Sequence, residues 1–133
     1  MITAVDSSVV WAIFNDENDG EIWVRTLAEA ASEGTLIICP VAFSELGPAA
    51  ENADRLAAKL DEYNITYDPI DPESAHLAGV MFKRYRIAGG PRQHLIPDFM
   101  IAAHAMVQAD RLAAIHRGYL RTWFSDLTLL QPK

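Results

Sequence analysis

The chain opens with the stretch Ile2-Thr3-Ala4-Val5-Asp6-Ser7-Ser8-Val9-Val10, in which a short apolar run meets an acidic residue and two serines. Residues 2–5 have the composition of a short buried strand. Asp6 stands where a helix can begin, and its carboxylate can accept a hydrogen bond from the first turn of that helix. A strand that leads directly into a helix is typical of an α/β fold.

The same alternation continues along the rest of the chain. Further strands are predicted at residues 36–39, 65–67 and 112–115, and residues 127–130 are expected to form a last strand at an edge. Helices are predicted at about 19–33, at roughly 50–63, from 72 to about 85 and from 97 to about 108, with a loop at 88–94. A further helix is predicted with Pro40 in its first turn, and it carries Phe43, Glu45 and Leu46. Residues 1–133 are therefore expected to form a single α/β domain, in which helices flank a central, mostly parallel sheet.

Bulk composition excludes several classes of protein. The chain has 133 residues, half of them hydrophobic, which is enough for one domain with a core. No apolar run is long enough to span a membrane, and the first residues do not resemble a signal peptide, so we expect a cytoplasmic protein without a membrane partner. Cys39 is the single cysteine, which rules out an internal disulfide and a cysteine zinc cluster.

The net charge of −7 is unevenly distributed along the sequence. Residues 1–82 contain fifteen acidic and three basic residues, a balance of −12, whereas residues 83–133 contain three acidic and eight basic residues, a balance of +5. A basic half in an acidic chain is a hint of contact with a polyanion. An ordinary solvated basic face explains the same pattern about equally well.

Three carboxylates lie in apolar sequence, namely Asp6, Glu45 and Asp98, and His116 has a similar setting. Burial of a carboxylate is costly unless another group neutralises it, so three together suggest a shared cation. In parallel α/β sheets, ligands bind outside the carboxyl ends of the strands. Asp6 and His116 follow predicted strands, Glu45 lies in the helix after the second strand, and Asp98 starts a helix that leads into a strand. We therefore expect all four at one edge of the sheet.

Carboxylate oxygens suit Mg²⁺ and Mn²⁺, and such an ion can support phosphodiester hydrolysis beside a basic flank. Each acid also has an ordinary explanation, because Asp6 can simply cap its helix, Glu45 can face solvent and Asp98 can complement a helix dipole.

No phosphate-binding glycine loop or serine nucleophile elbow is present in the sequence. Hydrolysis of a small phosphate ester remains a weaker alternative. His104, six residues after Asp98, points elsewhere on the helix and is expected to be structural or surface-exposed.

Four blocks of the sequence, taken together, resemble the PIN domain family. They are Val5–Val10 near the N-terminus, Phe43–Leu46, Ile96–Ala105, and the closing segment of Ile115–Tyr119 with Phe124–Leu127. The blocks occur in the expected order and span essentially the whole chain. At this length the sequence is similar to the VapC-type toxins of bacterial and archaeal toxin–antitoxin pairs, and the resemblance implies a single three-layer PIN-like domain.

The resemblance also implies a function. It implies an endoribonuclease that depends on Mg²⁺, or on Mn²⁺ as a substitute, and that cleaves RNA. It implies a homodimer neutralised by a small VapB-type antitoxin whose tail enters the active-site groove. Asp6, Glu45 and Asp98 match the metal-binding acids of the family position by position. We add as candidate phosphate contacts three arginines, Arg92, Arg117 and Arg121, although arginine is equally common in surface ion pairs.

His116 departs from the family pattern, which usually has aspartate at that position. A neutral imidazole could shift the metal preference towards Mn²⁺. Alternatively, a second metal could be lost, which would leave one ion and slower turnover. A third interpretation is a catalytically impaired module that binds RNA or its antitoxin without cleavage. We favour a one-metal site that retains activity, with His116 as part of the catalytic group, because the other three acids are intact.

Overall fold

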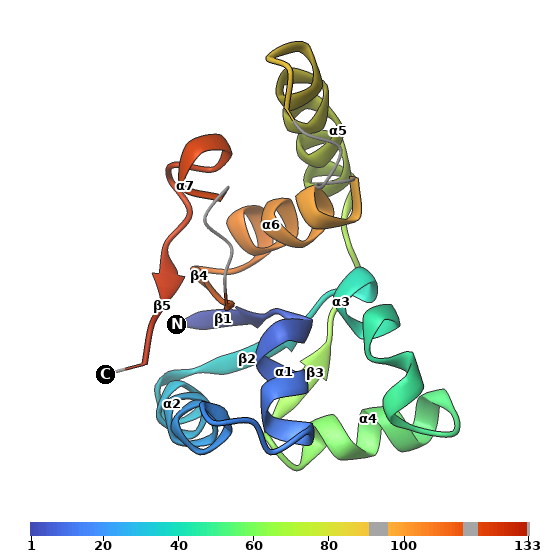
Figure 1. The fold of residues 1–133 in the computed structure, drawn as a ribbon, viewed down its shortest axis with the longest axis vertical. Coiled ribbons are helices and arrows are strands. Elements are labelled where there is room, and N and C mark those ends of the chain that lie inside the picture. Colours follow the sequence, from blue (N-terminus) through green and yellow to red (C-terminus); the bar gives the residue numbers. More distant parts are fainter. Residues whose placement is uncertain (91–95, 116–119, 133) are drawn as a thin grey trace.

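The computed structural model describes residues 1–90, 96–115 and 120–132, although nothing is described of the side chains of residues 120 and 121. A five-stranded sheet lies at the centre, with α1, α2 and α4 on one face and α5 and α6 on the other (Figure 1). The arrangement is the three-layer α/β fold that the sequence predicts. Among the described residues, no helix is both long enough and apolar enough to cross a membrane.

The sheet is parallel throughout its described pairings. Its strands are β1 (Ile2–Val5), β2 (Thr35–Ile38), β3 (Ile65–Tyr67), β4 (Arg111–Ala113) and β5 (Leu129–Leu130). They lie in the order β3-β2-β1-β4-β5, and each neighbouring pair is parallel. β1 is therefore central, and β5 is an edge strand as the sequence predicts.

The helices follow the predicted order with small changes in their bounds, except that α7 was not predicted. They are α1 (Ser7–Phe14), α2 (Gly20–Glu33), α3 (Pro40–Glu45), α4 (Ala53–Asp61), α5 (Pro72–Ile87), α6 (Ile96–Gln108) and α7 (Leu120–Trp123), with a 3₁₀ turn at Gly47–Ala49. The predicted helix at 50–63 is shorter in the structure. Asn52 caps its start by accepting a hydrogen bond from the backbone of Arg55 at 2.9 Å, and Asn64, with φ of 63°, turns the chain into β3.

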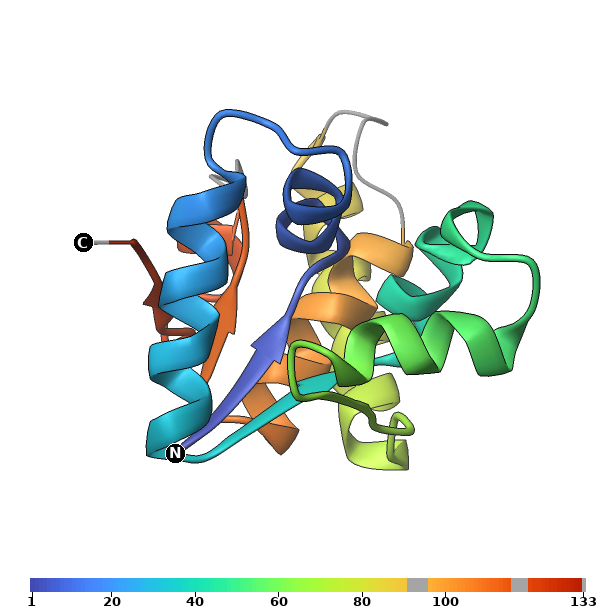
Figure 2. The same cartoon turned by 90° about the horizontal axis from the view of Figure 1, so that it is seen from below.

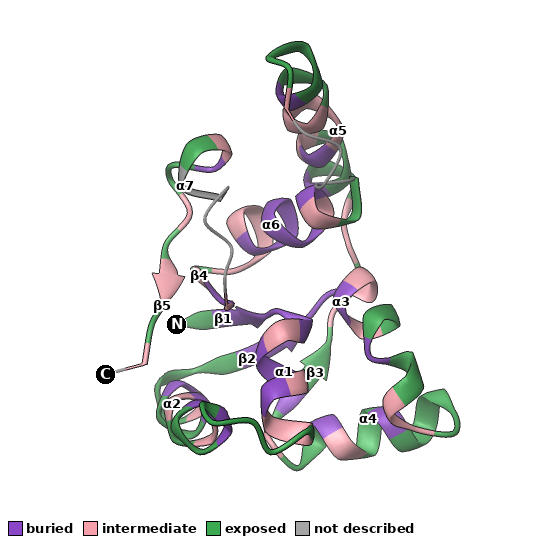
Figure 3. Cartoon of the chain, in the orientation of Figure 1, coloured by how far each residue is buried: buried purple, intermediate pink, exposed green. Residues whose placement is uncertain are grey.

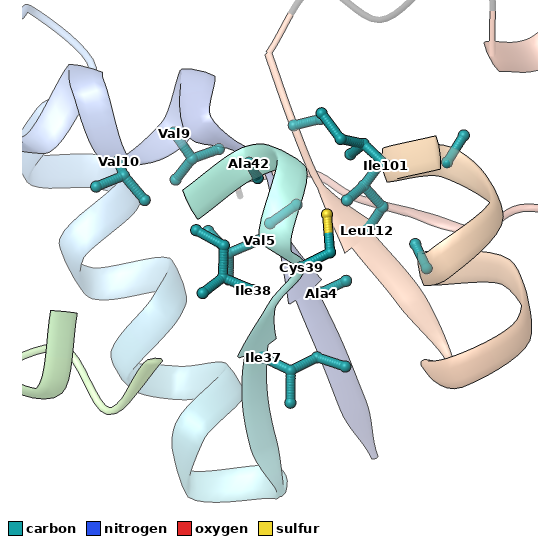
Figure 4. Packing of buried hydrophobic residues seen from close by; sticks show 14 of the residues in the cluster. Ala4, Val5, Val9, Val10, Ile37, Ile38, Cys39, Ala42, Ile101 and Leu112 are labelled. Carbon is teal, nitrogen blue, oxygen red and sulfur yellow. The ribbon is translucent and has the colours of Figure 1, made fainter. Parts of the chain in front are cut away.

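The apolar core lies on both faces of the central strands. Val5, Ile38 and Leu112 come from β1, β2 and β4 and are all buried, and Figure 4 shows them with Val9 of α1 and Ile101 of α6. Burial of each such side chain contributes on the order of 1.5–3 kcal/mol. Figure 3 shows that buried residues gather on β1, α1 and α6, whereas β3 and much of α5 are exposed. Packing of these side chains thus holds the central strands β1, β2 and β4 in place relative to α1 and α6.

A polar network fastens α6 to the start of α5. The buried ring of His104 lies 2.8 Å from the carboxylate of Asp68, and Gln108 donates to the same carboxylate at 3.0 Å. The side-chain oxygen of Gln108 accepts from the backbone of Asp71 at 2.9 Å and from the hydroxyl of Ser74 at 2.7 Å. Of the two alternatives expected for His104, a structural role and exposure at the surface, the structure shows the structural one.

Candidate functional site

The carboxyl edge of the sheet gathers the starts of α1 and α3 and the segment that follows β4. β1 leads directly into Asp6, and Figure 2 shows its carboxyl end pointing towards α1. The backbone N–H of Asp6 donates to the carbonyl of Ala113, the last residue of β4, at 2.9 Å. α3 packs against both α1 and α6, so the elements that carry the three predicted acids adjoin one another.

Asp6 is fully buried, with 0% of its surface exposed, and it caps α1. One oxygen of its carboxylate, Oδ2, accepts from the backbone N–H of Ser8 at 3.2 Å and also from the Ser8 hydroxyl. Both predictions for this residue, a buried setting and a helix cap, are confirmed. The cap alone does not account for the hydroxyl bond, since a helix N-cap needs only a backbone donor.

Glu45 lies at the last residue of α3 and is exposed, so the expectation of an apolar setting is wrong for this side chain. α3 has only six residues, and its buried contacts are made by Ala42 and by Leu46 just after it, which leaves Glu45 on the outer side. Its Oε1 accepts a hydrogen bond from the hydroxyl of Ser7 at 2.9 Å. This bond joins the end of α3 to the first residue of α1, beside Asp6.

Cys39 provides a second sign that the two carboxylates face the same region. The thiol lies in the apolar cluster between β2 and α3 (Figure 4). Burial raises the pKa of the Cys39 thiol, and the negative charges of Asp6 and Glu45 raise it further against the opposing effect of two backbone hydrogen bonds. Both carboxylates are therefore within electrostatic reach of one buried side chain.

Asp98 lies in the first turn of α6 and is partly exposed. α6 contacts α3 and β1, which brings Asp98 to an element next to the Asp6–Glu45 pair. Within residues 1–90, 96–115 and 120–132, however, no three Asp, Glu, His or Cys side chains form a group that could hold a metal ion. The predicted acids thus share a region without forming a closed three-ligand cluster there.

The donor chemistry of this region fits a hard cation. Mg²⁺ is typically held by one or two protein carboxylates together with waters and substrate phosphate, and it does not require a complete cage of protein ligands. Asp6 and Glu45 supply two carboxylates at one edge of the sheet. These residues are the ones that would hold such an ion, with Asp98 on the adjoining helix.

Ser7 and Ser8 are functional candidates that the sequence reasoning did not select. Ser7 holds Glu45, and Ser8 holds Asp6 while accepting a hydrogen bond from the backbone N–H of Ile115 at 3.0 Å. The signal was present in the sequence as two hydroxyl residues directly after an acid at a strand end. Its meaning depends on which elements meet there, and that becomes visible only in the folded chain.

Three of the predicted site residues, Arg92, His116 and Arg117, lie outside the described residues, and the side chain of Arg121 in α7 is likewise outside them. Among the described basic residues, Arg111 begins β4 at the opposite edge of the sheet, where it binds Thr3 at 2.9 Å and Glu33 at 3.3 Å. The remaining members of the basic half on α5, Lys83, Arg84 and Arg86, are exposed at its C-terminal end. The roles predicted for Arg92, His116, Arg117 and Arg121 therefore stay predictions.

Comparisons with known proteins agree with this fold. The family model described as PIN domain matches residues 3–118. Among solved structures, VapBC2 from Rickettsia felis, bound to a DNA fragment from its promoter, has a TM-score of 0.74 at 17% identity, with 97% of each chain covered. VapBC-1 from nontypeable Haemophilus influenzae has a TM-score of 0.69 at 19% identity, covering 97% of this chain and 96% of the other. FitAcB from Neisseria gonorrhoeae has a TM-score of 0.65 at 17% identity, covering 99% and 98%. No curated protein sequence matches the chain.

Proposed function

Because the chain belongs to the PIN domain family, we propose that it is a metal-dependent endoribonuclease that acts as the toxin of a toxin–antitoxin pair. The observation that carries this proposal is the arrangement of Asp6 and Glu45, which two consecutive serines hold at the carboxyl edge of the parallel sheet. The cap of α1 gives Asp6 a role in folding, but it does not require the exposed carboxylate of Glu45 that Ser7 holds beside it.

In this proposal, Asp6, Glu45 and Asp98 hold Mg²⁺, or Mn²⁺ as a substitute. A bound ion of this kind lowers the pKa of a coordinated water and stabilises negative charge on a phosphodiester. Asp6 contributes a carboxylate whose orientation is fixed by two hydrogen bonds from Ser8. Glu45 contributes a carboxylate that solvent and an RNA phosphate can reach, because it is exposed.

The substrate is proposed to be RNA, bound through its phosphates by arginines of the second half of the chain. Arg92, Arg117 and Arg121 remain the proposed contacts near the acids because they flank Asp98 and position 116 in the sequence. Lys83, Arg84 and Arg86 at the end of α5 offer a further basic surface for a long polyanion. Cleavage should therefore weaken as the salt concentration rises, as expected for binding that neutralises several phosphates.

A small VapB-type antitoxin is the proposed partner. The similar structures from Rickettsia felis and Haemophilus influenzae are VapBC proteins, which supports a partner of the same kind here.

We further propose that the chain forms a homodimer. Its motivation is the exposure of two large apolar side chains close to the ends of neighbouring helices, Ile87 on α5 at 76% and Ile96 on α6 at 42%. Light scattering on the purified chain gives its mass in solution directly, and a monomer at all concentrations contradicts this part of the proposal.

The activity is tested by incubating the purified chain with total RNA in Mg²⁺, in Mn²⁺ and in excess chelator. The expected result is metal-dependent cleavage that is lost in Asp98→Asn. Asp54→Asn is the matched control, since Asp54 is also a first-turn acid, on α4, and lies outside the proposed site. Unimpaired cleavage by Asp98→Asn contradicts the proposed site, and the absence of any metal-dependent product contradicts the activity.

The second candidate function is a PIN-like module that binds RNA or its antitoxin without cleavage. Two observations favour it, namely histidine at position 116 and the lack of a three-ligand group among the residues that the structure describes. The same RNA preparation separates the two candidates when binding is measured beside cleavage. Tight binding of RNA or antitoxin with no cleavage in either metal supports the module.

A further inference from the structure

The hydroxyl of Ser8 lies between the carboxylate of Asp6 and the backbone that follows β4. It donates to Oδ2 of Asp6 and accepts from the N–H of Ile115 at 3.0 Å. A serine hydroxyl has one proton to donate and two lone pairs that accept. The Asp6 bond therefore uses its only donor, and the Ile115 bond uses an acceptor on the same oxygen atom.

The two bonds join the adjoining ends of β1 and α1 to a segment that is far away in the sequence. Asp6 follows β1, Ser8 lies in the first turn of α1, and Ile115 lies 107 residues after Ser8. A second bond, from the backbone N–H of Asp6 to the carbonyl of Ala113, runs beside the first at 2.9 Å. The last residue of β4, Ala113, and Ile115 two residues later are thus each bonded to the start of α1, and Ile115 is followed in the sequence by His116.

We propose that Ser8 is a positioning residue of the proposed nuclease site, which sets the orientation of the Asp6 carboxylate and holds the backbone leading to position 116 against it. The inference rests on the proposed function, because it assigns Ser8 a role towards the metal that Asp6 would hold. Ser8 itself is not assigned as a ligand of that metal.

The competing interpretation is that Ser8 only stabilises α1. The N-cap of α1 is already provided by the bond from the Ser8 backbone N–H to Asp6, which any residue at position 8 other than proline could make. The hydroxyl adds nothing that the helix needs. What it adds is a charge-assisted bond to one carboxylate oxygen and an acceptor for a backbone donor of another element. Such partners of a metal-binding side chain typically change metal affinity or activity about 10–100-fold.

The test compares Mn²⁺ binding by four forms of the chain, measured by the loss of the free Mn²⁺ paramagnetic resonance signal. In Ser8→Ala the dissociation constant for Mn²⁺ is expected to rise about 10-fold or more. Ser8→Thr retains the hydroxyl and should bind within about threefold of the original chain. Ser74→Ala is the control, because it removes a serine hydroxyl near the start of another helix, where it is buried and bound to Gln108.

Two further measurements separate positioning from stability. Amide hydrogen exchange of Ile115 should become faster in Ser8→Ala and not in Ser74→Ala, because only the first removes its acceptor. RNA cleavage should fall about 10–100-fold in Ser8→Ala at a metal concentration that saturates the original chain. Control and test variants that unfold at similar temperatures but differ in Mn²⁺ affinity support the proposal.

The outcomes that overturn the inference are distinct from those that overturn the proposed function. If the original chain binds Mn²⁺ and cleaves RNA, and Ser8→Ala does both equally well, then Ser8 has no positioning role. A loss of Mn²⁺ affinity of the same size in Ser74→Ala also overturns it, because the effect is then one of general stability. If the original chain neither binds Mn²⁺ nor cleaves RNA, the proposed function fails and the inference fails with it.

Discussion

Substitution of Asp6 by asparagine and by alanine separates the two roles of this residue. Asp6 caps α1 through its side-chain oxygen and supplies a buried negative charge at the carboxyl edge of the sheet. Asparagine retains an oxygen acceptor and is as good an N-cap as aspartate, whereas alanine removes both the acceptor and the charge. The two variants therefore differ in the cap while sharing the loss of the carboxylate.

The size of the stability difference follows from the hydrogen bonds. Replacing an aspartate or asparagine cap by alanine costs about 0.5–2 kcal/mol, and in Asp6→Ala the Ser8 hydroxyl also loses its acceptor. We expect Asp6→Ala to be less stable than Asp6→Asn by about 1–3 kcal/mol. For a domain of this size that corresponds to roughly 3–15 °C in the unfolding temperature, at about 3–5 °C per kcal/mol.

The assay pairs thermal unfolding with metal-dependent RNA cleavage on the same preparations. Asp6→Asn should unfold close to the original chain and yet lose cleavage by at least 100-fold, because an uncharged amide is a poor ligand for a hard cation. Asp6→Ala should lose both stability and cleavage. Cleavage by Asp6→Asn at the original rate would refute the functional role and leave Asp6 as a helix cap only. Equal stability of the two variants would refute the cap.

Four other results are expected. Glu45→Gln should lower cleavage with an unfolding temperature within about 2 °C of the original, because the side chain is exposed, and a matching loss of stability would contradict this. Gln108→Ala should lower the free energy of unfolding by about 2–3 kcal/mol in denaturant titration, since one side chain makes four hydrogen bonds; a loss below about 0.5 kcal/mol would contradict it. The pKa of the Cys39 thiol is raised in the folded chain, so its contribution to stability is fully present below the ordinary thiol pKa, about 8.5, and is lost as the pH rises through the raised pKa. In Cys39→Ala, the free energy of unfolding should therefore fall less steeply with pH in the alkaline range. His116→Asp should increase cleavage in Mg²⁺, and equal rates would show that position 116 does not limit the reaction.

The order of the strands along the chain could be anticipated because each strand has its own local signal. Apolar runs bounded by Gly, Pro or Asp mark β1, β2 and β3, and the alternation with helices implies parallel pairing. The first and last residues of the helices were less predictable, because a single capping residue can decide where a helix begins. Asn52 starts α4 later than its composition suggests, and α7, with four residues, is too short to show a helical period.

The candidate site could be anticipated only in part. The sequence places Asp6 and Glu45 after strands, and parallel topology brings such positions to one edge. It cannot reveal that Ser7 reaches Glu45 across 38 residues or that Ser8 reaches Ile115 across 107, since those pairs depend on how α1 packs against α3 and β4. Apolar neighbours in the sequence also overstate burial, because Glu45 ends a short helix and faces outward.

The difference in burial between Asp6 and Glu45 bears on how a metal would bind here. The electrostatic argument for a shared cation holds for a buried carboxylate, and of this pair only Asp6 is buried. An exposed Glu45 is well solvated and needs no cation, so the protein alone offers a weak site. Mg²⁺ commonly completes its coordination with waters and substrate phosphate. Metal and RNA should therefore strengthen each other's binding, and Mn²⁺ affinity measured with a non-cleavable RNA present should exceed the affinity of the chain alone.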